Sequence, residues 1–138
     1  QAYGLAARSP EAQESLLRWM FLVLEVGHAV IELRREQDAL PALPPYAAEV
    51  PWRRAIRAMG RALIRLFVQP SAENRQRALD AVQQAIDSAR EAAEPYALHF
   101  EQAPVRRVLS YLHFIRASLL NPHSPLPPLP APEPHHAA

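Results

Sequence analysis

The chain has 138 residues, a formal net charge of +1 and no cysteine. This length suits one domain, the near-neutral charge argues against a nucleic-acid partner, and the lack of cysteine excludes disulfides and thiolate metal sites. Apolar residues make up 49% of the chain but aromatic residues only 7%, a balance that favours helices over sheets. The first residue is glutamine rather than methionine, which suggests a segment cut from a longer protein.

The longest predicted helix covers residues 10–37 and follows a start signal at Ser9, Pro10 and Glu11. On a helical wheel its polar residues form one narrow stripe: Glu11, Glu14, Arg18, Glu25, His28 and Glu32. The apolar arc is wider than a surface helix needs, and it comprises Leu16, Trp19, Met20, Val23, Val26, Gly27, Val30 and Ile31. Two interpretations remain open: a central bundle helix, or a helix covered on one side by its own domain and on the other by a partner. Glu25 and His28 in mid-run argue against a membrane span.

Three shorter helices are predicted between proline-containing breaks, over residues 51–68, 72–93 and 105–120. Pro51 and Pro104 mark starts, Ser71 is an N-cap, and Pro95 and Pro122 mark ends. The four helices predict an all-α fold, a four-helix antiparallel bundle with a long first helix, over residues 1–121. Residues 122–138 are rich in proline and predict an extended C-terminal tail.

A row of arginines is the clearest surface feature, and it consists of Arg54, Arg57, Arg61 and Arg65 opposite the apolar face of the second helix. A basic amphipathic helix can lie against anionic headgroups or hold an acidic partner. The acidic row of the third helix also points away from its own apolar face, so the two rows are not expected to pair. A plain solvated face is the alternative.

Glu25, His28 and Glu32 share one face of the first helix, a set that can bind a divalent metal or move a proton. No second histidine stands at the four-residue spacing of zinc-binding helices, so local pairing is the better interpretation. The sequence predicts no metal site and no cofactor. It also contains no nucleophile–histidine–acid pattern and no phosphate-binding loop, so no catalytic residue is assigned and no enzyme is expected.

Arg116 falls on the predicted inner face of the last helix, where a buried guanidinium requires an acceptor such as Glu25 or Glu101. An arginine edging the bundle with its charge in water is the alternative. Because arginine is also a natural partner for a carboxylate, a domain that senses aromatic acids is a second possible function.

Three segments resemble a known family: LLRWMFLVLEVGHAVIELR (16–34), LFVQPSAENRQRALDAVQQAID (66–87) and YLHFIRASLLNPHSPL (111–126). Together they resemble the soluble cytoplasmic region of the fusaric acid resistance (aromatic acid exporter) family of bacterial inner-membrane proteins. The family's membrane helices are absent from this chain. The resemblance implies a non-enzymatic cytoplasmic module of an efflux transporter that acts in subunit assembly or membrane-proximal docking. Its implied partners are further copies in a homo-oligomer, the membrane domain of the same polypeptide and the anionic inner leaflet.

Overall fold

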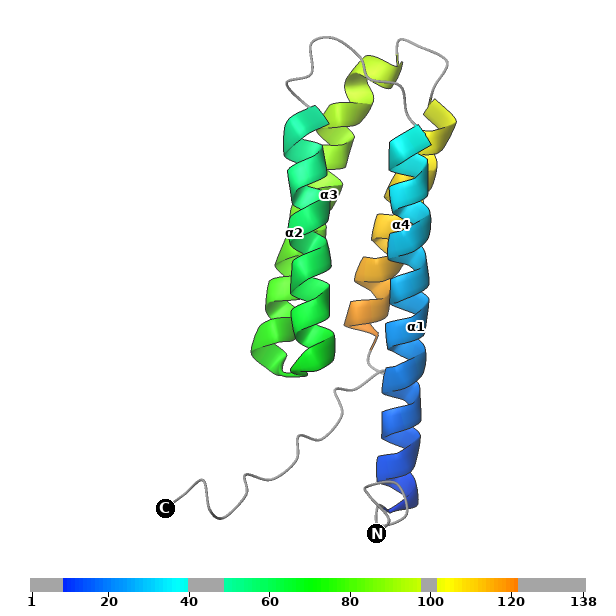
Figure 1. Ribbon diagram of the computed structural model, residues 1–138, viewed down its shortest axis with the longest axis vertical. Helices are drawn as coiled ribbons and strands as arrows, with labels where there is room; N and C mark the ends of the chain where they lie inside the picture. The colour runs from blue at the N-terminus through cyan, green and yellow to red at the C-terminus, as the bar shows by residue number, and fades with distance from the viewer. Residues whose placement is uncertain (1–8, 40–48, 98–101, 122–138) are drawn as a thin grey trace.

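The computed structural model describes residues 9–39, 49–97 and 102–121 of the protein. These contain four helices and no strand: α1 (Pro10–Ala39), α2 (Glu49–Val68), α3 (Ala72–Ala97) and α4 (Gln102–Leu120). Successive helices run in opposite directions (Figure 1). The prediction of an all-α antiparallel bundle is therefore confirmed. The predicted tail over 122–138 lies outside the described residues.

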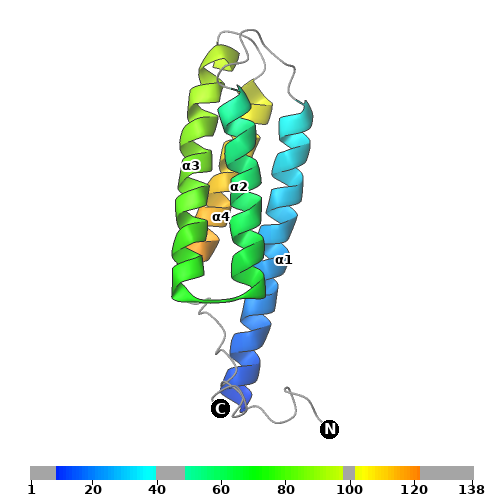
Figure 2. The same cartoon turned by 60° about the vertical axis from the view of Figure 1, so that its left-hand side comes forward.

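The bundle consists of two helix pairs laid side by side. α1 packs along α4, α2 packs along α3, and α3 joins the pairs by packing against α4. α1 and α2 meet at an edge-to-face contact between the rings of Trp19 and Phe67, whose centroids are 6.0 Å apart. The N-terminal part of α1 projects beyond the ends of the other three helices, as two views of the bundle show (Figure 1, Figure 2).

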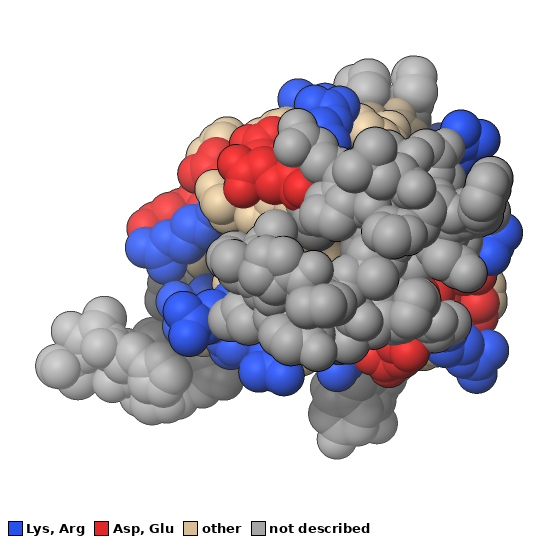
Figure 3. Space-filling view, turned by 90° about the horizontal axis from the view of Figure 1, so that it is seen from above, with Lys and Arg blue, Asp and Glu red and all other residues tan. Residues whose placement is uncertain are grey.

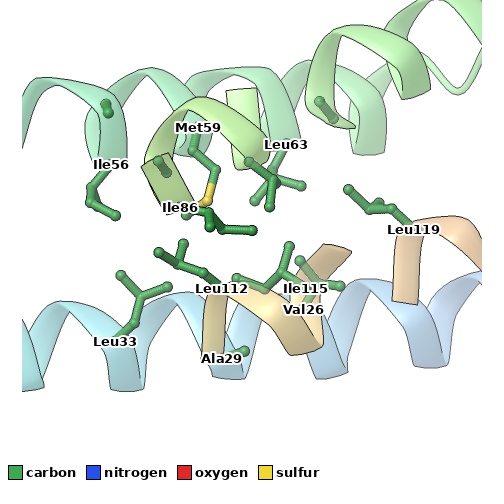
Figure 4. Packing of buried hydrophobic residues seen from close by; sticks show 14 of the residues in the cluster. Val26, Ala29, Leu33, Ile56, Met59, Leu63, Ile86, Leu112, Ile115 and Leu119 are labelled. Atoms are coloured by element: carbon green, nitrogen blue, oxygen red, sulfur yellow. The ribbon is translucent and has the colours of Figure 1, made fainter. Parts of the chain in front are cut away.

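All four helices contribute to one core (Figure 4). The buried side chains recur every three or four residues along each helix, which is the spacing that keeps them on one face. The largest fully buried ones are Val26, Leu33, Trp52, Met59, Leu63, Leu66, Val82, Ile86, Val108, Leu112 and Ile115. α3 buries three small residues completely, Ala78, Ala85 and Ala89, in addition to Val82 and Ile86.

Serine side chains cap α1 and α3 as predicted. The backbone N–H of Ala12 donates to Ser9 Oγ at 3.1 Å, and that of Asn74 donates to Ser71 Oγ at 3.0 Å. Asn74 also donates its side-chain amide to the carbonyl oxygen of Gln69 at 2.8 Å, which fixes the short turn between α2 and α3. The caps satisfy N–H groups that the helix itself leaves without acceptors.

Three prolines occupy other positions in the helices than the sequence predicted. Pro51 and Pro104 occupy the third rather than the first position of α2 and α4. Both still lie in the first turn, where the missing N–H would have no acceptor within the helix. The predicted end at Pro95 is wrong, because α3 continues to Ala97. A proline near a helix end removes one backbone bond, and that loss stays confined to the final turn.

Replacing Ser71 with alanine is expected to lower the free energy of unfolding by about 1 kcal/mol, because the Asn74 N–H loses its acceptor. The measurement is urea unfolding followed by circular dichroism. Ser110→Ala is the control, since it removes the same oxygen from an exposed position inside α4. Equal losses in the two variants would show that the Ser71 cap contributes nothing specific.

Candidate functional site

The row of large apolar side chains opposite the buried face of α1 is exposed. Trp19, Leu22, Val26, Ala29 and Leu33 face the core. Half a turn around the helix lie Leu17, Met20, Phe21, Leu24 and Ile31, which we name the α1 row; Leu24 is 66% exposed and Phe21 63%. The predicted apolar arc included Met20 and Ile31 but not Leu17, Phe21 or Leu24. The structure thus leaves a second apolar side of α1 uncovered.

A pocket of about 360 Å³ lies beside the α1 row, between α1 and α4. Its walls are almost entirely apolar, and they come from Glu25, His28 and Ala29 on α1 and from Ser110, Tyr111 and Phe114 on α4. The pocket brings together two predicted site residues, Glu25 and His28, both of which are exposed. The α4 residues were missed, because their place in the site depends on the pairing of α1 with α4.

The predicted stripe of Glu25, His28 and Glu32 does not form a metal centre. Glu32 accepts a hydrogen bond from the Arg35 guanidinium at 3.3 Å, one turn along the same helix. Within residues 9–39, 49–97 and 102–121, no three potential metal ligands lie close enough together to hold an ion. Local pairing is the interpretation that the geometry supports.

Arg116 fits the second of its two interpretations, an arginine at the edge of the bundle with its charge in water. Val108, Leu112, Ile115 and Leu119 form the buried face of α4, whereas Arg116 is exposed. On the wheel Arg116 lies at the edge of that face, and its long stem lets the guanidinium reach solvent. It does not line the α1–α4 pocket, and Glu101, one of its suggested acceptors, lies outside the described residues. The pocket therefore has no arginine to hold a carboxylate.

The arginines of α2 form an exposed basic face as predicted. Arg54, Arg57, Arg61 and Arg65 are all exposed, and none of them forms an ion pair within the described part of the chain. Seen from above, basic side chains follow the edge over α2, whereas acidic ones gather over α3 (Figure 3). The acids of α3 find partners on α3 itself: Glu73 pairs with Arg77 at 2.6 Å, and Asp80 and Asp87 accept from neighbouring glutamines.

The C-terminal half of α2 combines positive charge with exposed apolar side chains. Ile64 is 64% exposed and Val68 73%. These two residues, together with Arg61, Arg65 and Gln69, line a surface hollow of about 320 Å³. A second hollow of about 200 Å³ is lined by Arg61, Ala62, Arg65 and Arg77. Neither contains a carboxylate, so the surface suits a ligand with anionic and apolar parts.

The sequence predicted the four arginines but missed Ile64, Val68 and Arg77. Ile64 and Val68 were missed because the predicted row was chosen by charge alone, and neither residue was placed on the predicted apolar face. Arg77 belongs to α3 and reaches the α2 face only through the pairing of the two helices. We name the set Arg54, Arg57, Arg61, Ile64, Arg65 and Val68 the α2 face. None of the described helices is both long and apolar enough to cross a membrane.

Comparisons with known proteins agree with the resemblance found in the sequence. The model of the fusaric acid resistance protein family matches residues 1–126. The fusaric acid resistance protein FusD of Burkholderia cepacia is 45% identical over 127 residues, which cover 91% of this chain and 61% of that relative. The chain thus spans about three-fifths of the length of this curated relative. No solved structure matches the chain. On this evidence the chain belongs to the fusaric acid resistance protein family.

Proposed function

We propose that this chain is a non-enzymatic helical module of a bacterial efflux transporter of the fusaric acid resistance type, and that it docks on the anionic inner leaflet through the α2 face. The observation that carries the docking role is the unpaired arginine row with Ile64 and Val68 beside it. Membership of the family supports the transport context. The cytoplasmic side of the inner membrane is the location that this role requires.

Two properties of the α2 face favour contact with a lipid surface over simple exposure to solvent. An anionic leaflet attracts each nearby arginine by about 1 kcal/mol, and guanidinium groups bind phosphate through two parallel hydrogen bonds. Ile64 and Val68 lie among these charges, so they would enter the boundary between headgroups and acyl chains. Because no carboxylate of α3 neutralises the row, the full charge is available to a partner.

Sensing of aromatic acids is the weaker alternative. The pocket between α1 and α4 has room for an aromatic ring, but its ionisable residues are Glu25, His28 and Tyr111. A carboxylate at Glu25 opposes the entry of another carboxylate, and Arg116 is not among the lining residues. A thermal-shift screen with aromatic acids tests this alternative, since saturating ligand stabilises a folded protein by a few kcal/mol.

The test of docking is sedimentation with vesicles of phosphatidylglycerol and phosphatidylethanolamine at low salt. The full chain is expected to bind, and replacement of Arg57 and Arg61 with glutamate is expected to weaken binding by about 30-fold or more. Binding of the unchanged chain should also fall as salt rises, because surface charges are screened.

A matched control is the double replacement Arg90→Glu and Arg116→Glu. Both arginines are exposed, on α3 and α4, so the variant changes net charge equally without touching the α2 face. It is expected to retain most vesicle binding. If the two double variants lose binding equally, only net charge matters and the α2 face is not a docking surface. If the unchanged chain does not bind, the docking proposal fails.

A further inference from the structure

The apolar seam of α1 is nearly symmetric about Leu24. Leu17 stands seven residues before Leu24 and Ile31 seven residues after it. Phe21 stands three residues before it, and His28 four residues after it. Repeats of three and four residues that add to seven are the spacing by which two helices pack along a common seam. The row also lies opposite the core-facing side of α1, so a partner helix can reach it without disturbing the bundle.

We infer that a second copy of this chain covers the α1 row, with the two α1 helices antiparallel about a two-fold axis beside Leu24. A two-fold interface uses the same patch on both subunits, and so it requires a patch that is complementary to itself. In this arrangement Leu17 faces Ile31 of the other copy, and Leu24 faces its own counterpart. The family resemblance implies a role in assembly, and the inference assigns that role to a specific surface. It does not depend on docking through the α2 face.

The α1–α4 pocket gives the arrangement a second anchor. Phe21 and His28 lie on the same side of the α1 row, and the antiparallel register sets Phe21 of one copy opposite His28 of the other. His28 lines the pocket together with Tyr111 and Phe114. An aromatic ring fits apolar walls of this kind and gains from edge or offset contacts with their rings. Each subunit thus offers an exposed phenylalanine and a pocket to receive one.

Charges beside the row favour the antiparallel direction. Arg18 stands six residues before Leu24 and Glu32 eight residues after it, on the same flank of α1. The antiparallel register brings Arg18 of one copy near Glu32 of the other. In a parallel two-fold pair this flank of one copy would face the opposite flank of the other, so Arg18 and Glu32 would lie on opposite sides of the seam and could not pair. Within one chain Arg18 pairs with Glu14, and both side chains are exposed, so that pair exchanges at little cost. Glu32 is half-buried and pairs with the exposed Arg35 at 3.3 Å.

The first test is the mass of the full chain in solution, measured by light scattering and sedimentation across a range of concentrations. A dimer is expected, and Leu24→Glu is expected to raise its dissociation constant about tenfold or more, because a buried leucine contact is lost and two carboxylates meet at the axis. Ile64→Glu is the matched control: Ile64 is equally exposed but lies on α2, so this variant should remain dimeric. A monomer at all concentrations, or equal effects of the two variants, overturns the inference.

The second test fixes the direction of the helices. Since the chain has no cysteine, a single introduced thiol is unique. Leu24→Cys is expected to form a disulfide-linked dimer under mild oxidation. Leu17→Cys alone is not, because in the antiparallel register its two copies lie about 21 Å apart, far beyond disulfide reach. A mixture of Leu17→Cys and Ile31→Cys chains should cross-link to each other. Cross-linking of Leu17→Cys to itself would show a parallel pair and overturn the inference.

These experiments use no lipid, so they separate the two proposals. Loss of dimer in Leu24→Glu with retained vesicle binding supports assembly through α1 as a role distinct from docking. Loss of vesicle binding in the Arg57 and Arg61 variant with an unchanged dimer supports the converse. If the chain dimerises but does not bind vesicles, the proposed α1 interface is supported and only the docking role is contradicted. Circular dichroism of each variant checks that the bundle remains folded.

Discussion

Replacement of Leu112 with alanine is expected to lower the free energy of unfolding by about 2–5 kcal/mol. Leu112 is completely buried on α4, the helix that packs against both α1 and α3. It belongs to the same buried cluster as Leu33, Ala29 and Ile115 (Figure 4). Truncation there removes apolar contact and leaves a cavity that the rigid helix pairs cannot close fully, so both costs add.

The control for Leu112→Ala is Phe114→Ala, two residues along the same helix. Phe114 is 45% exposed, so its removal is expected to cost less than about 1.5 kcal/mol in urea unfolding. Phe114 also lines the α1–α4 pocket, so the same variant should weaken the proposed dimer while the monomer stays folded. Equal destabilisation by the two variants would show that α4 does not face the core as described. A weakened dimer in a stable bundle would tie Phe114 to assembly.

The helices were predictable because their signals are local. Ser9 and Ser71 cap α1 and α3 by accepting hydrogen bonds from N–H groups three residues away. Both caps could be recognised in the sequence. The periodic apolar residues of α2 and α4 likewise indicated faces that proved to be buried, such as Met59 and Leu112. Errors at the helix ends arose at prolines, whose cost depends on the turn in which they stand.

The site was less predictable because it depends on which helices pair. The wheel of α1 showed an apolar arc but not which part of it the other helices cover, and the structure buries Leu22 and Ala29 while it exposes Met20 and Ile31. The pairing of α1 with α4 creates the pocket at His28 and Phe114. No local signal indicates that pairing. The α2 arginines were predicted because a charged row opposite an apolar face needs no knowledge of partners.

Replacement of Gln37 with methionine is expected to raise the free energy of unfolding by about 1–3 kcal/mol. Gln37 is 5% exposed near the C-terminal end of α1, and its side-chain Nε2 has no hydrogen-bond partner among the residues that the structure describes. A buried amide donor without an acceptor loses its hydration and gains nothing in return. Methionine has a similar length, similar helix propensity and no such donor, so it keeps the packing and removes the penalty.

The control is Gln84→Met, which makes the same chemical change at an exposed position of α3. Because Gln84 donates to Ser88 Oγ at 3.3 Å, this variant is expected to lower the free energy of unfolding by no more than about 1 kcal/mol. The buried indole Nε1 of Trp52, in the first turn of α2, is another donor without a partner among the described residues. α2 begins at the end of the bundle where α1 finishes (Figure 1). A loss of stability in Gln37→Met would show that the buried amide is a stabilising contact rather than a penalty.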